Sequence, residues 1–263
     1  MSTIVFLGGG RITSAMLAGL RLKKTKHRFV VYDRNPGKLR DLKNNYAVAV
    51  ATDLNSAIQQ ADVLIVAVRP SSVAELLHAA GRPKRPLLAV SLAAGVPLRV
   101  LTNTLGFPVR WARAMPSPVC RSGRGLTAVT FSRMLPQRDR DRIIDLFASF
   151  GTVIEIPESK FDAFTVTYSC SHGYHALAAL ANAGQAAGLD RRVALVASAH
   201  ALADGIIAWR EGKHSLESLL EEAATPGGIA ATTRAAMDAA GYRKAVGQGV
   251  RAGLRRARAN SRQ

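Results

Sequence analysis

The chain has 263 residues, of which 48% are hydrophobic, so it carries enough apolar surface for a packed core and is not wholly disordered. Its two cysteines cannot form a disulfide framework, and no spacing of cysteine and histidine matches a zinc site. The formal net charge is +18, but the basic residues are scattered and are not interleaved with aromatic ones. This distribution argues against a dedicated nucleic-acid role and favours solubility and attraction of anionic ligands.

The lengths of the apolar stretches indicate whether the chain crosses a membrane or is exported. The longest apolar strings are short, such as residues 63–68, and the first residues lack the pattern of a signal peptide. We therefore expect no membrane span and a cytoplasmic protein. The densest basic block, residues 251–263, is expected to form a solvated helix end.

Short apolar strands and helices alternate along the first half of the chain. We expect strands at 4–7, 29–32, 48–51, 63–68, 87–91, 109–114, 126–131 and 152–156, and helices at 12–22, 38–44, 55–60, 71–80, 98–105 and 138–150. Strands that alternate with helices at this rhythm are typical of a parallel sheet with helices on both faces. The fold class is therefore α/β, with a Rossmann-type domain over residues 1–157.

The second half, residues 158–263, has few strand candidates and is rich in alanine and leucine. Its helical patterns run over residues 161–187, 192–209, 215–223, 232–239 and 243–258. These helices carry too few charges for a freestanding bundle, which favours burial in a subunit interface. We expect an all-helical substrate and dimerisation domain, and a homodimer or higher homo-oligomer.

A glycine-rich turn lies between the first strand and the first helix. Gly8 allows a tight turn, and Gly10 lets the backbone approach a pyrophosphate at the helix N-terminus. Thr13 stands at the third position of this fingerprint, where glycine or alanine is usual, and we expect it to crowd the contact between helix and strand. The turn indicates a dinucleotide site.

The second strand ends at two residues that point to different cofactors. Asp33 stands where a carboxylate holds the ribose hydroxyls of NAD, and Arg34 beside it is suited to the 2′-phosphate of NADP. The basic residues nearby favour NADP, and NAD stays open.

Several motifs occur in the order found in one enzyme family. They are Gly8–Ile12, Ala67–Pro70, Ser91–Gly95, Arg113–Pro118 and Thr225–Gly228. The chain resembles pyrroline-5-carboxylate reductases over essentially its whole length. This resemblance implies an N-terminal Rossmann domain, a helical C-terminal domain that interlocks two subunits, and reduction of a cyclic imine by NAD(P)H, most simply 1-pyrroline-5-carboxylate to L-proline.

The resemblance also implies site residues. The cofactor set is Gly8, Gly10, Arg11, Ile12, Asp33, Arg34, Asn55, Ala67, Val68, Arg69, Pro70, Ala93, Ala94, Gly95 and Ser117. The substrate set is Ser171, Thr225, Gly227, Gly228 and Ile229. Within the first set, Arg69 replaces the family's usual lysine and Ser117 its usual asparagine.

The substrate half departs further from the family. Residues 169–175 read Ser-Cys-Ser-His-Gly-Tyr-His, where the family usually has Ser-Gly-Ser-Gly-Pro-Ala-Tyr, and Ala230 falls where the family has a substrate-holding threonine. Two alternatives therefore stay open. One is a reductase of a different cyclic imine or a keto acid, and the other is a dinucleotide-binding protein without turnover.

Hydride transfer to a C=N bond proceeds best on a protonated imine in a dry, shaped site. His172, Tyr174 and His175 are therefore candidate proton donors, and packing at the start of a helix is the competing interpretation. His172 and His175 have no third ligand in register, so we expect no metal.

Overall fold

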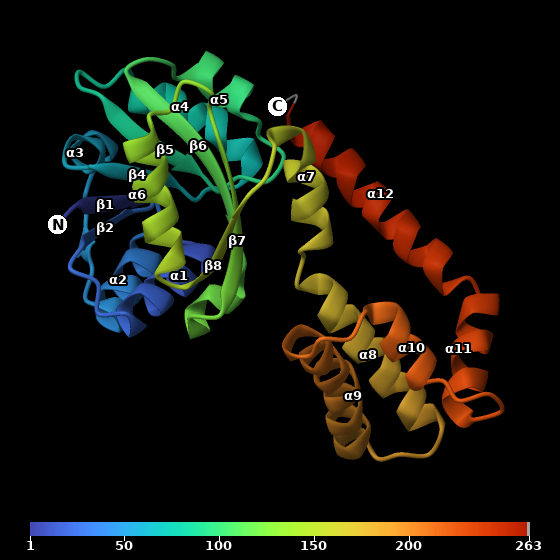
Figure 1. Cartoon of the computed structure of the whole chain (residues 1–263). Coiled ribbons are helices and arrows are strands. Elements are labelled where there is room, and N and C mark those ends of the chain that lie inside the picture. The colour runs from blue at the N-terminus through green and yellow to red at the C-terminus, as the bar shows by residue number, and fades with distance from the viewer. Residues whose placement is uncertain (262–263) are drawn as a thin grey trace. The chain divides into compact units, whose positions relative to one another are not determined.

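The computed structural model describes residues 1–261, which divide into two compact units (Figure 1). The first unit contains residues 1–168 and the C-terminal end of the chain from Ala252. The second unit spans Ser169–Arg251. The domain boundary expected at 157/158 stays a prediction, and the compact units divide a little later, at 168/169.

The first unit is built on one eight-stranded sheet with the strand order β3-β2-β1-β4-β5-β6-β7-β8. Its strands are β1 (Thr3–Leu7), β2 (Arg28–Tyr32), β3 (Ala49–Val50), β4 (Val63–Val66), β5 (Leu87–Ser91), β6 (Val109–Pro116), β7 (Gly125–Phe131) and β8 (Gly151–Glu155). The helices of this unit are α1 (Arg11–Leu22), α2 (Pro36–Tyr46), α3 (Leu54–Gln59), α4 (Val73–Ala80), α5 (Leu98–Thr104), α6 (Gln137–Ala148) and α7 (Glu158–Thr167), with short 3₁₀ turns η1 (Pro70–Ser72) and η2 (Pro118–Ser122).

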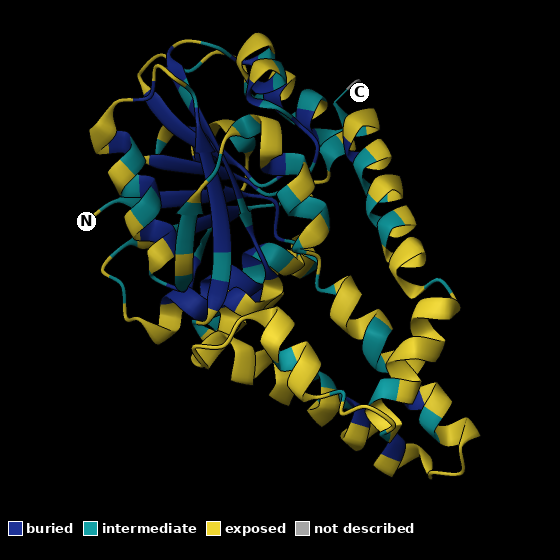
Figure 2. Ribbon diagram, turned by 45° about the vertical axis from the view of Figure 1, so that its right-hand side comes forward, coloured by how far each residue is buried: buried dark blue, intermediate teal, exposed yellow. Residues whose placement is uncertain are grey.

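The central strands form the core because they are apolar on both faces. Every residue of β4 and β5 is buried, and Figure 2 shows the strands of this unit dark beneath more exposed helices. One cluster of core side chains joins the sheet to α1 and α6, and a second joins it to α3, α4 and α5. The predicted sheet with helices on both faces is therefore confirmed.

One strand departs from the expected parallel arrangement. β7 runs antiparallel to β6, while the other neighbouring pairs of this sheet are parallel. Only the short turn η2 separates β6 from β7, whereas a parallel pair needs a crossover of a dozen or more residues. The short connection therefore reverses the chain direction.

The parallel strands bring the loops that follow them to one edge of the sheet. Leu7 at the end of β1 pairs with Tyr32 on β2 and with Val66 on β4, and Val66 pairs with Ser91 on β5. Loops at the carboxyl ends of neighbouring parallel strands form the ligand crevice of open α/β sheets. In this chain those loops contain most of the residues expected at the cofactor.

The second unit is helical. It contains α8 (Ser171–Ala186), α9 (Arg191–Glu211), α10 (Leu216–Glu222), α11 (Ile229–Ala239) and the first part of α12 (Tyr242–Asn260), whose end belongs to the first unit. The helix expected over 161–187 is instead two helices, α7 and α8, so that expectation was wrong.

Polar side chains at the break explain the difference. The Tyr168 hydroxyl accepts a hydrogen bond from the Leu126 backbone N–H at 2.8 Å, which ties the end of α7 to β7. Just beyond it, the Ser169 and Ser171 hydroxyls lie 2.7 Å apart. Serine side chains that bond locally in this way favour helix ends over helix interiors.

The second unit buries little of its own apolar surface. Within Ser169–Arg251 only Ala181, Ala194 and Ser198 are buried. Large apolar side chains of α9, such as Val196 and Ile206, are about half exposed. A patch of this kind on a folded chain marks an interaction surface.

α9 is also the one helix within residues 1–261 that is long and apolar enough, by length and composition alone, to cross a membrane. Length and composition alone do not make a helix a membrane span, so the expectation of no membrane span stays a prediction.

Candidate cofactor and substrate site

The turn after β1 requires glycine at its first position. Gly8 has φ +114°, and a Cβ added there would lie 2.6 Å from the carbonyl oxygen of Ala67. Its backbone N–H donates to the Tyr32 carbonyl at 2.8 Å. Gly8 thus lets the turn pass close to both neighbouring strands.

The N-terminus of α1 beyond this turn is open. Gly10 is the N-cap residue and gives the helix no side-chain cap, and a Cβ added at Gly10 would meet no atom within 4 Å. The first turn contains no acidic residue, and Arg11 there is exposed. Uncapped N–H groups and the positive end of the helix dipole suit a phosphate, so these residues fit a dinucleotide diphosphate.

Thr13 does not crowd the contact between helix and strand as expected. Its side chain is fully buried, and its hydroxyl donates to the Gly8 carbonyl at 2.6 Å. The threonine therefore ties the helix to the glycine turn and satisfies a buried carbonyl.

The carboxylate of Asp33 is already engaged by the protein. One oxygen accepts from the Gly9 N–H at 2.7 Å, and the other accepts from the Asn35 N–H at 2.8 Å. Lys38 lies 3.6 Å from the same carboxylate. Asp33 therefore holds the glycine turn against the end of β2, and its expected contact with a ribose stays a prediction.

Arg34 has a partner that sequence reasoning missed. Its side chain is 72% exposed and forms an ion pair with Glu75 of α4 at 3.0 Å. Glu75 is 41 residues away along the chain, so no local pattern could have paired the two. The exposed guanidinium, with Lys38 beside Asp33, places positive charge at the end of β2.

The loops after β4 and β5 lie at the same carboxyl edge of the sheet as the glycine turn. Ala67, Val68, Arg69 and Pro70 follow β4, and Arg69 is exposed. Ala93, Ala94 and Gly95 follow β5.

The C-terminal end of the chain supports the loop after β5. Gly95 has φ +75°, and a Cβ there would overlap the backbone of Ala257 in α12. The Ala94 carbonyl accepts from the Asn260 side chain at 3.1 Å. The expectation of a merely solvated helix end for 251–263 was therefore wrong for the described part, and Arg262 and Gln263 lie outside the described residues.

Two expected cofactor residues lie in other settings. Ser117 is buried after β6, where its hydroxyl accepts from the Val119 N–H at 3.1 Å. Asn55 lies in the first turn of α3, shortly after the carboxyl end of β3, and lines a cavity together with residues that precede β5. Ile12 lies in the first turn of α1.

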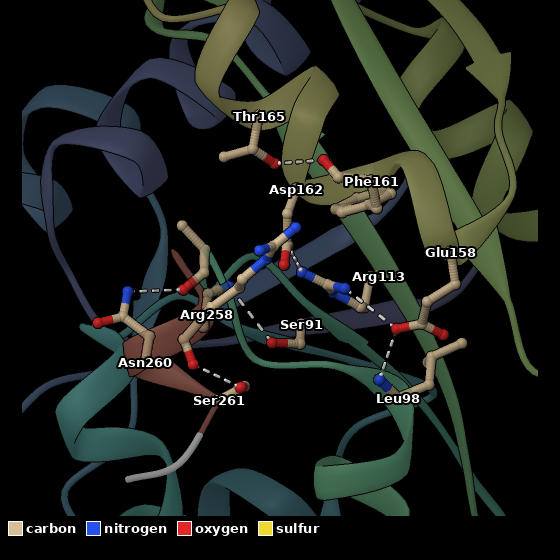
Figure 3. Close-up of polar contacts among 12 residues, drawn as sticks. Ser91, Leu98, Arg113, Glu158, Phe161, Asp162, Thr165, Arg258, Asn260 and Ser261 are labelled. Atoms are coloured by element: carbon tan, nitrogen blue, oxygen red, sulfur yellow. Dashed lines mark hydrogen bonds and ion pairs between the residues drawn. The ribbon is translucent and has the colours of Figure 1, made fainter. Parts of the chain in front are cut away.

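A buried arginine anchors α7 to the sheet near this edge. Arg113 on β6 is 1% exposed and pairs with Glu158 at 3.0 Å and with Asp162 at 3.1 Å (Figure 3). Its guanidinium carbon lies 4.4 Å from the centre of the Phe161 ring. Glu158 also accepts from the Leu98 N–H at 2.7 Å, so one carboxylate joins β6, α5 and α7. Arg113 belongs to one of the motifs quoted above, but no sequence pattern indicated its two carboxylate partners.

The candidate proton donors lie in the second unit. Ser171, His172, Tyr174 and His175 occupy the first turns of α8 and are exposed. Tyr174 is 69% exposed although it is large and aromatic. Whether these side chains donate a proton or stabilise the start of the helix therefore stays a prediction.

The expected carboxylate-binding turn connects α10 to α11. Gly227 has φ +78°, and the Gly228 N–H donates to the Thr225 carbonyl at 2.9 Å. Gly228 caps α11 without a side-chain bond, and Ile229 and Ala230 are exposed. Within the second unit, α8 packs along α9.

Other reactive groups show no sign of a further centre. Burial raises the pKa of the Cys120 thiol to about 12, so this cysteine is inert packing. Among residues 1–261, no group of three or more His, Cys, Asp or Glu side chains is placed to hold a metal.

Two family models match the chain, one in each half. Residues 3–95 match the model described as NADP oxidoreductase coenzyme F420-dependent. Residues 158–260 match the model described as pyrroline-5-carboxylate reductase dimerisation. The second match covers the helices whose apolar side chains are exposed in the single chain.

Curated relatives share sequence over nearly the whole length. The pyrroline-5-carboxylate reductase of Synechocystis is 31% identical over 256 residues, covering 95% of each chain. That of Mycobacterium leprae is 31% identical over 280 residues, covering 96% of this chain and 94% of the relative.

Solved structures share the fold. The pyrroline carboxylate reductase of Plasmodium falciparum, crystallised with NADP bound, superimposes with a TM-score of 0.87 at 20% identity, covering 99% of this chain and 98% of that one. The 1-pyrroline-5-carboxylate reductase of Streptococcus pyogenes superimposes with a TM-score of 0.89 at 24% identity, covering 98% of both chains.

Proposed function

The chain belongs to the pyrroline-5-carboxylate reductase family, and on that premise we propose that it reduces 1-pyrroline-5-carboxylate to L-proline with NADPH. The observation that carries the proposal is the uncapped start of α1 behind Gly8 and Gly10, which fits a dinucleotide diphosphate. NADPH supplies the hydride that the imine carbon accepts.

In this proposal the carboxyl edge of the sheet binds the cofactor. The N–H groups at the start of α1 hold the diphosphate, and Arg34 with Lys38 attracts the 2′-phosphate. Asp33 keeps the glycine turn in place through the Gly9 N–H. The loops Ala67–Pro70 and Ala93–Gly95 line the nicotinamide half.

The second unit supplies the groups for the substrate. The N–H groups at the start of α11, which follows Gly227 and Gly228 and begins at Ile229 without a side-chain cap, suit the substrate carboxylate together with the Thr225 hydroxyl. His172, Tyr174 or His175 donates the proton that the imine nitrogen gains as its carbon gains hydride. Ser171 contacts the substrate at the start of α8.

We also propose a homodimer or higher homo-oligomer of cytoplasmic location. The exposed apolar side chains of α9 and the match to a dimerisation model support assembly through the second unit. The same assembly accounts for the apolar character of α9 without a membrane.

The test is oxidation of NADPH by the purified chain with 1-pyrroline-5-carboxylate, followed by absorbance of the reduced nicotinamide and by identification of proline. Turnover that needs both substrates supports the proposal. Measurable NADPH binding without turnover contradicts it.

A second candidate is reduction of a different cyclic imine on the same scaffold. The departures at residues 169–175 and the alanine at 230 favour it, since both fall in the substrate half. Cyclic imines of different ring size and carboxylate position, compared by kcat/KM, decide between the two. A preference for 1-pyrroline-5-carboxylate removes this candidate.

A further inference from the structure

We propose that a cavity at the amino edge of the sheet is a second binding site, for a small organic anion. The cavity has a volume of about 390 Å³ and lies between α3, the end of α4 and the loop that leads into β5. This volume is within the range of small-molecule sites. The proposal does not depend on the reductase activity.

Three cations line this cavity, and none of its lining residues is acidic. Arg82, Lys84 and Arg85 come from the loop before β5. The side chain of Lys84 forms no hydrogen bond or ion pair with the part of the chain that the structure describes. Its ammonium group is therefore available to a ligand.

Backbone carbonyls hold the two arginines in place. The Nε of Arg82 donates to the Phe107 carbonyl at 2.9 Å. The Nη2 of Arg85 donates to the carbonyls of Gln59 and Ala61, near the end of α3. Each guanidinium keeps donors beyond these bonds, and because their partners are neutral, both positive charges stay uncompensated.

The rest of the cavity wall is largely apolar. Ile58, Ala80, Pro83 and Leu87 contribute to it, and Asn55 and Gln59 each add an amide. An apolar wall with a few convergent charged donors selects a ligand with an apolar body and one anionic group. A carboxylate or phosphate on a ring or short chain has this chemistry.

This site is separate from the cofactor crevice. Leu87 begins β5 and Gln59 precedes β4, so the cavity lies at the amino ends of strands whose carboxyl ends face the glycine turn. A ligand there would not compete with a dinucleotide. The cavity also gives part of the net charge of +18 a role.

The test titrates the full-length chain with benzoate, phenyl phosphate and inorganic phosphate by calorimetry, with and without saturating NADPH. We expect both organic anions to bind in either condition, and inorganic phosphate to bind more weakly. Lys84→Gln and Arg82→Gln should each weaken binding of the organic anions at least fivefold. Lys160→Gln is the matched control, because Lys160 is an exposed lysine of the same unit outside the cavity.

A charge-neutral variant separates this cavity from general attraction to a basic surface. Ala80→Met fills the apolar wall without changing charge, and we expect it to weaken the organic anions while leaving inorganic phosphate unchanged. Three results would overturn the proposal: no binding of the organic anions, equal binding by all variants, or binding that disappears when NADPH is added. The last result would place the probe in the cofactor crevice.

Discussion

Gly8 and Gly10 are glycines for different physical reasons. Gly8 needs a positive φ and close contact with Ala67, which concerns folding, whereas the space around Gly10 is open and concerns a ligand. The sequence motif alone does not distinguish the folding role of Gly8 from the ligand-binding role proposed for Gly10. The backbone contacts of the two residues do distinguish them.

Gly10→Asp should abolish NADPH binding and leave the thermal midpoint of the free protein nearly unchanged, because the added carboxylate would face the cofactor diphosphate. Gly8→Ala should instead lower the midpoint, because its Cβ would strike the Ala67 carbonyl. Nicotinamide fluorescence and thermal unfolding give the two readouts. A Gly10→Asp protein that still binds NADPH would place the diphosphate elsewhere.

In the proposed cofactor site, Glu75 would compete with the 2′-phosphate of NADPH for Arg34. Glu75→Gln should therefore lower the KM for NADPH and leave the KM for NADH unchanged. The change should be only several-fold, because an exposed ion pair is weak. Arg34→Ala should raise the KM for NADPH more than that for NADH. Equal effects on the two cofactors would show that Arg34 does not bind the extra phosphate.

Cys120 gives a dependence of stability on alkaline pH. Its thiol pKa rises from 9.0 to about 12 in the folded state, because burial disfavours the thiolate. The unfolded chain loses this proton above about pH 9 while the folded chain keeps it, so folding free energy is lost as pH rises from about 9 to 12. Cys120→Ala should show a shallower loss over this range by denaturant unfolding. Identical slopes would contradict the burial of this thiol.

The residue scale also shows what the sequence could predict. The glycine turn at Gly8 and Gly10 could be predicted because a motif between strand and helix has a fixed geometry. The loops after β4 and β5 were assigned through the family resemblance, and their contacts with the cofactor stay predictions. The bonds of Asp33 to Gly9 and of Arg34 to Glu75 were not found, because a side chain's partner depends on segments far apart in the chain.

At the scale of elements, strands and helices were predictable wherever apolar periodicity was strong. β4 and β5 were predicted from continuous apolar runs. The direction of β7 and the break between α7 and α8 were missed, since a short turn and a tyrosine hydroxyl decide them.

Arg113 joins three elements, and its loss should affect them together. Arg113→Met would leave Glu158 and Asp162 without their cation, at a cost of about 3 kcal/mol in the free energy of unfolding. Arg243→Ala, which removes an exposed pair with Asp238, should cost less than about 1 kcal/mol. Denaturant unfolding measures both. Equal costs would mean that burial adds nothing to the Arg113 pairs.

At the scale of the whole molecule, the two units differ in how they bury apolar surface. The first unit has cores on both faces of its sheet, whereas the second leaves large apolar side chains exposed. A unit of this kind needs a second surface against it, as expected from the low charge of its helices.

Ile206→Glu should therefore lower the molar mass of the protein in solution or cause it to aggregate, because it places a charge on the exposed apolar surface of α9. Met134→Glu is the matched control, since Met134 is also exposed but belongs to the first unit. Light scattering coupled to size exclusion measures the mass. An unchanged mass for Ile206→Glu would exclude this part of α9 from the interface.

The contacts of α12 determine which end of the chain is suited to an affinity tag. Asn260 and Ala257 touch the loop at Ala94 and Gly95, so an affinity tag fused downstream would begin only a few residues from the crevice. Met1, by contrast, is almost wholly exposed and precedes the amino end of β1. Affinity tags and immobilisation anchors should therefore be fused before Met1, where they would not obstruct nucleotide entry to the proposed crevice.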